Sequence, residues 1–405
     1  MIFKIKLHWQ ILIALVAAIA FGFFLPDLVQ YVSWMGVVFL RALNMVVVPL
    51  ILSSIISGVA SIGSGPNLGR LGVKTMSFYI VTSLIAILTG LFFVNLFQPG
   101  VGANLGAAGD VQPLPQGSNS ASDILMRTIP DNVFDAMAKG EILPVIFFAI
   151  LFGFFITQIQ TEKQQQLTRF FDSVFEVMMK ITSFVILFTP LGIFAIVSKE
   201  VAKNAGSLSN IAGSLGIYML TVFIALLVHG AIILPLLVRF LGKASPLKHF
   251  RNMATPLLTA FSTASSNAAL PLSMVAVEEK NGVSKKITSF TLPLGATINM
   301  NGTALYECVA VIFIAQVYGI DLTMGQQAII VLTALLAAIG SAGIPMAGLV
   351  MMTIVLTAVN LPLEGIGLIL AVDRILDMSR TTVNVWGDTC AAVIIAKSEG
   401  ETLNV

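Results

Sequence analysis

Charged residues are scarce in this sequence, and that scarcity excludes most soluble folds. Only 10% of the 405 residues are charged and 57% are hydrophobic, whereas soluble domains are about 25% charged. A chain this apolar cannot cover itself with polar surface in water, so a lipid bilayer is its natural solvent. The net charge of +2 gives no reason to expect a nucleic-acid partner.

Cysteine and histidine are also rare. Cys308 and Cys390 both lie in apolar stretches, which indicates buried positions rather than a disulfide framework or a zinc site. The three histidines, His8, His229 and His249, have no metal-ligand spacing. No Ser-His, Gly-x-Ser-x-Gly or His-Glu-x-x-His arrangement points to an enzyme. We therefore expect neither a cofactor nor catalysis.

Long apolar runs are what the sequence does contain. We interpret the first run, from Ile11 to Leu25, as a transmembrane helix rather than a signal peptide, because no small-residue cleavage site follows it. A transmembrane helix needs about 20 mostly apolar residues, and six clear candidates are 10–28, 33–60, 75–97, 141–159, 173–199 and 214–241. The stretch from Pro99 to Asp123, rich in Gly, Pro, Asn, Ser and Gln, is typical of an exposed loop.

Basic residues predict the orientation. If the six spans alternate, most Lys and Arg fall in loops on one side, which is therefore cytoplasmic. Segment 252–279 has basic loops at both ends, and segment 324–361 has loops without Lys or Arg at both ends. A segment that enters and leaves on one side is a re-entrant hairpin, and such backbone is tolerated only where protein or a cavity surrounds it.

An internal repeat supports this interpretation. The heptapeptide from Thr297 to Thr303 resembles that from Thr382 to Asp388, and each follows a hairpin rich in small residues. The order is hairpin, broken helix, hairpin, polar helix, and the copies enter from opposite sides. Inverted repeats with interrupted segments at matching positions indicate a transporter binding site at the membrane midplane.

The last helix carries polar residues at intervals of three to four, so that they share one face. A charged residue inside a membrane costs at least about 2.5–3.5 kcal/mol, so such a face indicates a substrate and ion pathway. Arg380 offers a planar fork for a carboxylate, and Asp377 could bind an ammonium group. The face also includes Thr381, Asn384 and Asp388, and Asp373 lies earlier in the same helix.

Three further groups could bind ions. Asn299, Asn301 and Thr303 interrupt an apolar segment, where Gly295 and Gly302 allow local unwinding. Glu307 is either a paired structural carboxylate or a proton- or cation-coupling site. Hydroxyl groups of the third helix that share one face could coordinate an ion, or bond to their own helix; they belong to Tyr79, Thr82 and Ser83.

At this point the motifs resemble one family over essentially the whole chain. The chain is similar to the glutamate transporter family of dicarboxylate/amino acid:cation symporters, which includes archaeal aspartate transporters and animal excitatory amino acid transporters. The motifs that carry the resemblance are Phe39 to Ile51, Thr189 to Phe194, Leu292 to Thr303, Ile339 to Pro345 and Asp373 to Asp388.

The resemblance implies an all-α fold of eight transmembrane helices and two re-entrant hairpins, assembled as a homotrimer in the cell membrane. A scaffold part (about 1–70 and 125–210) would hold the trimer. A transport part (about 71–98 and 214–405) would move across the bilayer like an elevator, with hairpin one at 245–280 and hairpin two at 324–361.

The resemblance also implies site roles. Arg380 would bind the substrate's side-chain carboxylate and Asp377 its amino group. The rest of the pocket would comprise Thr381, Asn384, Thr303, Ser265 and Ser266, with hairpin two, from Ile344 to Gly348, as the gate. One sodium would use Asp388, Asn384, Asn299 and the carbonyl of Gly295. A second would use backbone around Thr297, Met300 and Ser341. A third would use Tyr79, Thr82, Ser83, Asn299 and Asn301.

Three positions depart from the family's pattern. Asn301 stands where the family usually has Asp, which removes a charge from the third cation site. Ala264 and Met378 occupy the two places where the family usually has an arginine beside the substrate. Glu307 matches the animal transporters, where the corresponding residue is tied to proton and potassium coupling. We therefore predict fewer bound Na⁺ and a contribution from H⁺.

The predicted function is symport of L-aspartate or L-glutamate with Na⁺. A C4-dicarboxylate would place two acids together at Asp377, and a neutral amino acid would leave Arg380 unpaired. These substrates remain alternatives within the family, and an anion channel is the alternative from another class. The sequence cannot rank aspartate against glutamate, because one methylene is a small pocket change.

Overall fold

The fold is seen in a computed structural model, which describes residues 7–60, 66–103, 129–203, 208–339 and 347–405. Within these ranges every regular element is a helix, which confirms the all-α prediction. By length and composition, four segments can span a bilayer: Ser33–Ala60, Arg70–Phe97, Gly213–Phe240 and Lys285–Val317. A bent pair, Thr161–Ile186 with Thr189–Lys199, would make a fifth.

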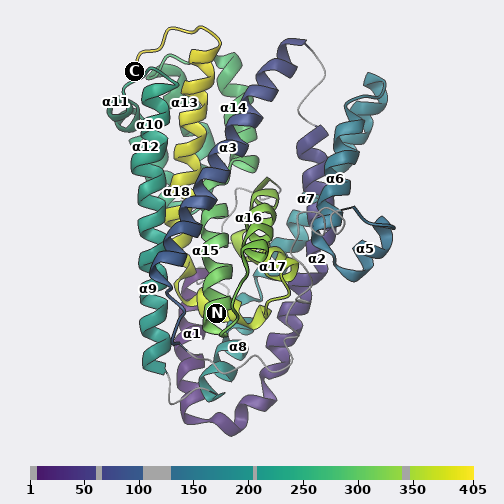
Figure 1. The fold of residues 1–405 in the computed structure, drawn as a ribbon, viewed down its shortest axis with the longest axis vertical. Helices are drawn as coiled ribbons and strands as arrows, with labels where there is room; N and C mark the ends of the chain where they lie inside the picture. Colours follow the sequence, from purple (N-terminus) through teal and green to yellow (C-terminus); the bar gives the residue numbers. More distant parts are fainter. Residues whose placement is uncertain (1–6, 61–65, 104–128, 204–207, 340–346) are drawn as a thin grey trace.

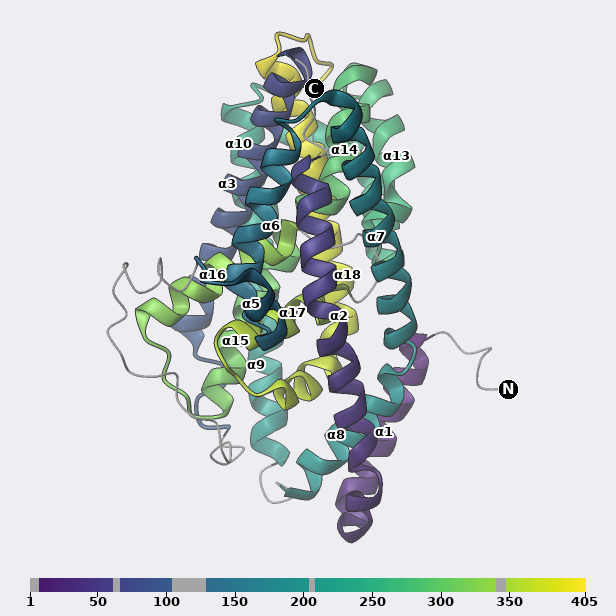
Figure 2. The ribbon, with the colours of Figure 1, turned by 90° about the vertical axis from the view of Figure 1, so that its right-hand side faces the viewer.

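One group of helices comes mainly from the first half of the chain. α2 packs against α6, α7 and α8, and α8 packs against α1. In Figure 1, α2, α5, α6 and α7 stand on the right of the molecule, and α1 and α8 lie toward its lower end. In Figure 2 that right-hand side faces the viewer, with α2 and α7 in front. The elements of this group are α1 (Leu7–Phe24), η2 (Pro26–Tyr31), α2 (Ser33–Ala60), α5 (Val133–Lys139), α6 (Ile142–Ile156), α7 (Thr161–Ile186) and α8 (Thr189–Lys203).

The second group is built around α18 and α15. α12, α14 and α15 pack on α18, and α3 packs along α15 and α9. Its elements are α3 (Pro66–Phe97), α9 (Leu208–Leu227), η4 (Val228–Ile233), α10 (Leu234–Phe240), α11 (Pro246–Asn252), α12 (Ala254–Thr263), α13 (Ser266–Glu279), α14 (Lys285–Ile298), α15 (Asn301–Val317), α16 (Met324–Ile339), α17 (Ala347–Ala358), η5 (Leu363–Gly365) and α18 (Ile366–Ser398).

Prolines explain where the observed helices depart from the predicted spans. The predicted span 173–199 is two helices bent by 51°, because Pro190 has no N–H to bond the Ile186 carbonyl. The first helix ends at Phe24 rather than residue 28, just before Pro26. The predicted span 214–241 is confirmed as one candidate span, Gly213–Phe240, in which a π-helical turn, η4, precedes Pro235 and absorbs the missing hydrogen bond.

Hairpin one consists of α12 and α13, joined at a tight turn. Ala264 adopts a left-handed φ of 51° there, and the Ser265 hydroxyl caps α13 by accepting from the Ala268 N–H at 3.3 Å. The segment predicted as hairpin two contains α16 and α17, and its predicted tip lies outside the described residues. Both helices of hairpin two also touch α2, so this hairpin lies between the two helix groups.

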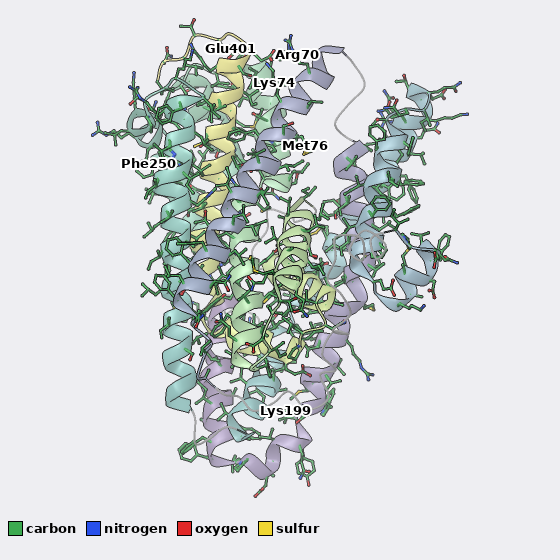
Figure 3. The ribbon with its side chains drawn as sticks, in the orientation of Figure 1. Arg70, Lys74, Met76, Lys199, Phe250 and Glu401 are labelled. Atoms are coloured by element: carbon green, nitrogen blue, oxygen red, sulfur yellow. The ribbon has the colours of Figure 1, made fainter. Side chains whose placement is uncertain are left out.

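A basic end of the molecule carries Arg70, Lys74 and the C-terminus, whereas Lys199 lies toward the opposite end (Figure 3). Glu399 accepts from Lys74 Nζ and from Arg70 Nη2, each at 2.6 Å, and so joins the end of α18 to α3. The Lys74 ammonium, with Arg70, holds the pKa of the Glu399 carboxyl below its ordinary value. By the positive-inside rule we expect this end to face the cytoplasm.

Candidate functional site

The candidate site is built at the interruption between α14 and α15. Asn299 and Met300 have ψ values of 66° and 54° and leave the helix, which resumes at Asn301. A Cβ on Gly302 would overlap the backbone of Arg380 in α18, so only glycine allows this approach. The break therefore lies directly against the polar face of α18.

Asn384 of α18 fills the break. Its Oδ1 accepts from the backbone N–H groups of Gly302 (2.7 Å) and Thr303 (3.3 Å), and its Nδ2 donates to the Thr303 hydroxyl at 3.0 Å. The first N–H groups of a helix have no partner within it, so a side chain from another helix completes the start of α15. The structure thus brings Asn384, Thr303 and Met300 together, with Met300 Sδ 3.3 Å from Asn384 Nδ2.

One turn away on α18, Arg380 is buried between two carboxylates. Its Nε donates to Asp377 Oδ1 at 3.1 Å, and its Nη1 donates to Asp373 Oδ1 at 3.2 Å. Tyr306 of α15 donates to the same Asp373 oxygen at 2.7 Å, and its ring lies 4.2 Å from the guanidinium carbon. A buried cation is stable only when paired in this way.

The guanidinium still has unused bonding capacity. Arg380 Nη2 lies 2.9 Å from Asp377 Oδ1, yet it forms no aligned hydrogen bond within the described part of the chain, and Asp373 Oδ2 has no partner there either. A Cβ on Gly348, at the start of α17, would lie 2.8 Å from the guanidinium nitrogens. The start of α17 therefore lies against a buried cation that can accept another anion.

A second cluster surrounds Asp388. Asn299 Nδ2 donates to Asp388 Oδ1 at 2.8 Å, and a Cβ on Gly295 would lie 2.5 Å from that oxygen and 2.8 Å from the Tyr79 hydroxyl. Beside it, Ser83 donates to Asn301 Oδ1 at 2.7 Å. Six predicted ion-binding residues, from α3, α14, the break, α15 and α18, are thus adjacent.

Several polar atoms of this region lack partners among the described residues. Asn299 Oδ1 is a buried acceptor with no donor, and both carboxylate oxygens of the buried Glu307 are equally unsatisfied. Buried acceptors without donors are costly and are expected only where a ligand, ion or proton satisfies them. The side-chain oxygens in this region are ligands of the kind that Na⁺ uses. Within the described ranges, no group of three or more His, Cys, Asp or Glu side chains is placed to hold a metal ion.

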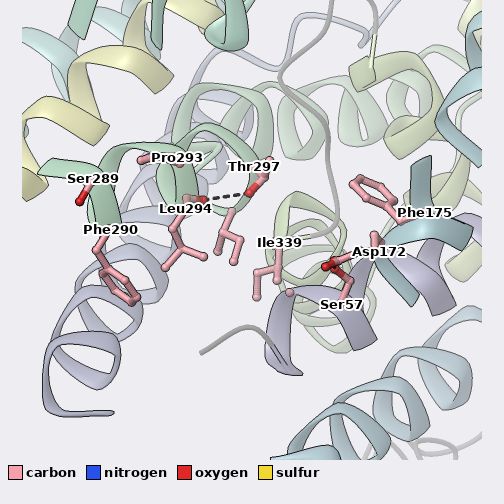
Figure 4. Close-up of a pocket in the computed structure, with 12 residues that line it drawn as sticks. Ser57, Asp172, Phe175, Ser289, Phe290, Pro293, Leu294, Thr297 and Ile339 are labelled. Atoms are coloured by element: carbon pink, nitrogen blue, oxygen red, sulfur yellow. Dashed lines mark hydrogen bonds between the residues drawn. The ribbon is translucent and has the colours of Figure 1, made fainter. Parts of the chain in front are cut away.

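Other predicted residues lie at the edge of this arrangement. Thr82 donates to the Phe78 carbonyl of its own helix at 2.8 Å. Thr297 donates to the Leu294 carbonyl at 3.0 Å and lines a cavity of about 350 Å³ between α14 and the α2–α7 pair (Figure 4). Thr381 is buried beside Arg380, and Ser265 and Ser266 start α13, which packs on α18. The predicted residues Ser341 and Ile344 lie outside the described residues.

Two residues of the site had no role assigned from the sequence. Asp373 lies seven residues before Arg380, two helical turns away on the same face, so the helical spacing could have identified it. Tyr306 lies in a mainly apolar stretch beside Glu307, and no pattern in the sequence distinguishes it.

Comparison with known proteins decides the family. The model of the sodium:dicarboxylate symporter family matches residues 7–398. The chain belongs to this family. It is 37% identical to the proton/glutamate-aspartate symporter of Escherichia coli (strain K12), over 98% of this chain and 93% of that protein. It is 36% identical to the proton/sodium-glutamate symport protein of Geobacillus stearothermophilus (98% and 96%), and 35% identical to excitatory amino acid transporter 3 of Mus musculus (96% and 85%).

The family explains why these polar residues lie inside an apolar bundle. Its members are symporters, so the protein is a multi-pass membrane transporter of this family rather than a member of a known enzyme family. The resemblance predicted from the motifs is thereby confirmed across nearly the whole chain.

Proposed function

We propose that this symporter carries L-aspartate or L-glutamate into the cell together with Na⁺. The observation that carries the proposal is the buried Arg380, flanked by Asp377 and Asp373, with bonding capacity left for one more carboxylate. The names of the relatives, glutamate-aspartate symporters and excitatory amino acid transporters, support the same substrate class.

In the proposed binding mode, the planar fork of Arg380 takes the side-chain carboxylate of the substrate. Asp377, nearly one turn earlier on α18, takes the ammonium group. The α-carboxylate would meet hydroxyl and amide groups, which are Thr381, Asn384, Thr303 and the hairpin-one residues Ser265 and Ser266. Hairpin two, from Ile344 to Gly348, would close the site, in keeping with how near Gly348 lies to the guanidinium.

Sodium would bind at the oxygen-rich clusters below the substrate. The first site would use Asp388, Asn384, Asn299 and the Gly295 carbonyl. The second would use backbone around Thr297, Met300 and Ser341. The third would use Tyr79, Thr82, Ser83, Asn299 and Asn301. The orphan Asn299 Oδ1 supports a bound cation at the first and third places, whereas the uncharged Asn301 favours weaker binding at the third.

Glu307 would add a proton to the transported ions. Its carboxylate is fully buried and has no partner among the described residues, so a neutral, protonated form avoids an isolated buried charge. Flux that is equally insensitive to pH in the parent and in Glu307→Gln would exclude this role.

The proposed architecture is that of an elevator in a homotrimer in the cell membrane. Eight spans and two re-entrant hairpins would form a scaffold part (about 1–70 and 125–210) and a transport part (about 71–98 and 214–405). The two helix groups support this division, as does the cavity between them lined by Ser57, Asp172 and Thr297 (Figure 4). An interface that must slide is expected to be less tightly packed than a core.

Uptake of radiolabelled L-aspartate into liposomes containing the purified protein tests the proposal. A sodium gradient should drive accumulation of aspartate. Arg380→Lys keeps the charge but loses the planar fork, so it should reduce this accumulation more than about tenfold, the size expected for the loss of a bidentate contact to a carboxylate. Arg41→Ala, at an exposed arginine of α2, is the matched control and should transport normally.

Competition by unlabelled compounds distinguishes the alternatives. Succinate that competes as well as aspartate would indicate a dicarboxylate carrier, and L-serine that does so would indicate a neutral amino acid carrier. Accumulation that follows only a proton gradient would overturn the sodium assignment.

A further inference from the structure

An apolar groove lies on the side of α18 that faces away from the polar site. The cavity has a volume of about 690 Å³, within the range of about 300–1,000 Å³ typical of ligand pockets. Leu227 and Gly230 line one wall, Leu247 and Phe250 the rim, and Trp386 the floor. Ser379, Thr382 and Val383 of α18 complete it, so an occupant would touch the residues directly beside Arg380 and Asn384.

Local structure explains why the groove exists. The π-helical turn η4 presents only Gly230 and Ala231 to the cavity, so no side chain fills the space in front of α18. The Trp386 indole donates to the Gly230 carbonyl at 2.9 Å, and its ring stacks on His249 at 4.7 Å between centroids. These contacts fix the orientation of the Trp386 ring, which forms the flat floor of the groove. Only 4% of the Trp386 surface is exposed.

The cytoplasmic end of the groove is strongly basic. Arg239, Lys243, Lys248 and Arg251 are all exposed there, and none forms an ion pair in the part of the chain that the structure describes. Arg239 lies one helical turn beyond the lining residue Pro235, and Arg251 one turn beyond Leu247. The sequence has no Asp or Glu from Val201 to Val277, so the positive charge is not offset within these helices.

The groove is apolar and ends at a cluster of cations at the membrane surface. A ligand that fits both parts is an acyl chain attached to an anionic headgroup. We propose that the groove binds an anionic phospholipid, with one acyl chain against Trp386 and the phosphate at Arg239 and Arg251. A bound acyl chain would contact the face of α18 opposite Arg380 and Asn384. Lipid binding would therefore change how firmly α18 holds these two residues of the polar site. Exposed apolar residues at the rim, Leu247 at 60% and Phe250 at 53%, are consistent with lipid contact.

Trp386 offers a direct test, because the sequence contains only three tryptophans. The exposed Trp9 and Trp34 are replaced by Phe, which leaves Trp386 as the single fluorophore. The full chain is reconstituted in phosphatidylcholine vesicles that contain increasing fractions of acyl-brominated phosphatidylglycerol or acyl-brominated phosphatidylcholine. We expect phosphatidylglycerol to quench Trp386 at lower fractions than phosphatidylcholine.

Charge and shape variants sharpen the result. Arg239→Gln and Arg251→Gln should each raise the phosphatidylglycerol fraction needed for half-quenching about fivefold. The pair Lys163→Gln/Arg169→Gln changes the charge as much as both arginine variants together, on the exposed surface of α7, and should leave quenching unchanged. Ala231→Phe should fill the groove and abolish quenching by both lipids.

Three outcomes would overturn the proposal. Equal quenching by the two brominated lipids would mean ordinary contact with bulk lipid, without headgroup recognition. No quenching by either lipid would mean that protein, such as a second copy of the chain, covers the groove. Arginine variants that behave like the α7 control would remove the headgroup site. None of these outcomes depends on transport, so the test is independent of the proposed substrate.

Discussion

The segments Thr297–Thr303 and Thr382–Asp388 have Thr, Asn and Gly at the same positions, yet only the first breaks its helix. In the first copy, Asn299 and Met300 leave helical geometry, and the N–H groups that follow are bonded by Asn384 of the second copy. The second copy stays within the continuous α18. One copy thus supplies an opened backbone, and the other supplies the side chains that complete it.

The two glycines of the repeat show the same asymmetry. A Cβ on Gly302 would overlap the main chain of Arg380, which cannot move without shifting α18. The atoms nearest to a Cβ on Gly387 would be the side-chain amide nitrogens of Asn301 and Asn299, at 3.0 and 3.1 Å. The same residue type is therefore required for backbone approach in one copy and for side-chain room in the other.

The largest effect is expected from alanine at these two glycines. Gly302→Ala should lower the free energy of unfolding by about 3 kcal/mol or more, because overpacking against backbone cannot relax. Gly387→Ala should change it by less than about 1 kcal/mol, because helix propensity offsets a small side-chain shift. Thermal unfolding of the detergent-solubilised proteins, followed by size-exclusion chromatography, measures both.

Gly387→Ala is the control for Gly302→Ala, since both add one methyl group. If the two variants unfold at the same temperature, the close approach of the broken helix to α18 does not contribute to stability. In that case the asymmetry between the copies would be only geometric.

The sequence predicted that a broken helix lies beside a polar helix, but not which residues join the two. The repeat and the polar residues of α18 indicated a broken helix beside a polar helix, and the structure contains both. The identity of the partners was not predictable, because Asn384 contacts a backbone 81 and 82 residues away and no local pattern encodes that distance. Tyr306 was missed because it looks like any apolar-face residue.

The predicted boundaries of one transmembrane span were wrong for a different reason. Hydropathy predicted 173–199 as one helix, since both halves are apolar, but a single proline at position 190 separates α7 from α8. Hydropathy measures compatibility with lipid, whereas helix continuity depends on individual backbone hydrogen bonds. Both properties are in the sequence, but the second requires each proline to be considered separately.

Asparagine substitutions address the same comparison at the level of hydrogen bonds. Asn384→Ala leaves two buried N–H groups of α15 unpaired, at about 1–3 kcal/mol each. Asn299→Ala leaves only Asp388 Oδ1 without its donor. Without substrate or sodium, Asn384→Ala should therefore unfold at the lower temperature, and the reverse order would show that the break does not depend on the second copy.

A smaller effect is expected from Asp373, which pairs with Arg380 in the absence of substrate. Asp373 occupies Nη1, so a substrate carboxylate must compete with it. Asp373→Asn should raise the apparent affinity for L-aspartate about tenfold, equivalent to about 1.4 kcal/mol, and should lower the stability of the ligand-free protein. Equilibrium binding of radiolabelled aspartate measures the first effect.

Asp321→Asn is the control, because it removes a carboxylate from an exposed loop. Unchanged or weaker binding in Asp373→Asn would mean that Asp373 orients Arg380 for the substrate rather than competing with it.

The smallest effect is expected at the end of α18, far from the repeat. Lys74 and Arg70 lower the pKa of Glu399, so the ion pair stabilises the folded state fully at pH values above the ordinary carboxyl pKa. That stabilisation is lost as the pH falls through the lowered pKa, because a protonated Glu399 no longer attracts either cation. Glu399→Gln should cost under about 1 kcal/mol at neutral pH, as exposed ion pairs do, and nothing in strong acid. Thermal unfolding of both proteins across this pH range measures the difference; a difference that persists in acid would mean that Glu399 acts through packing rather than charge.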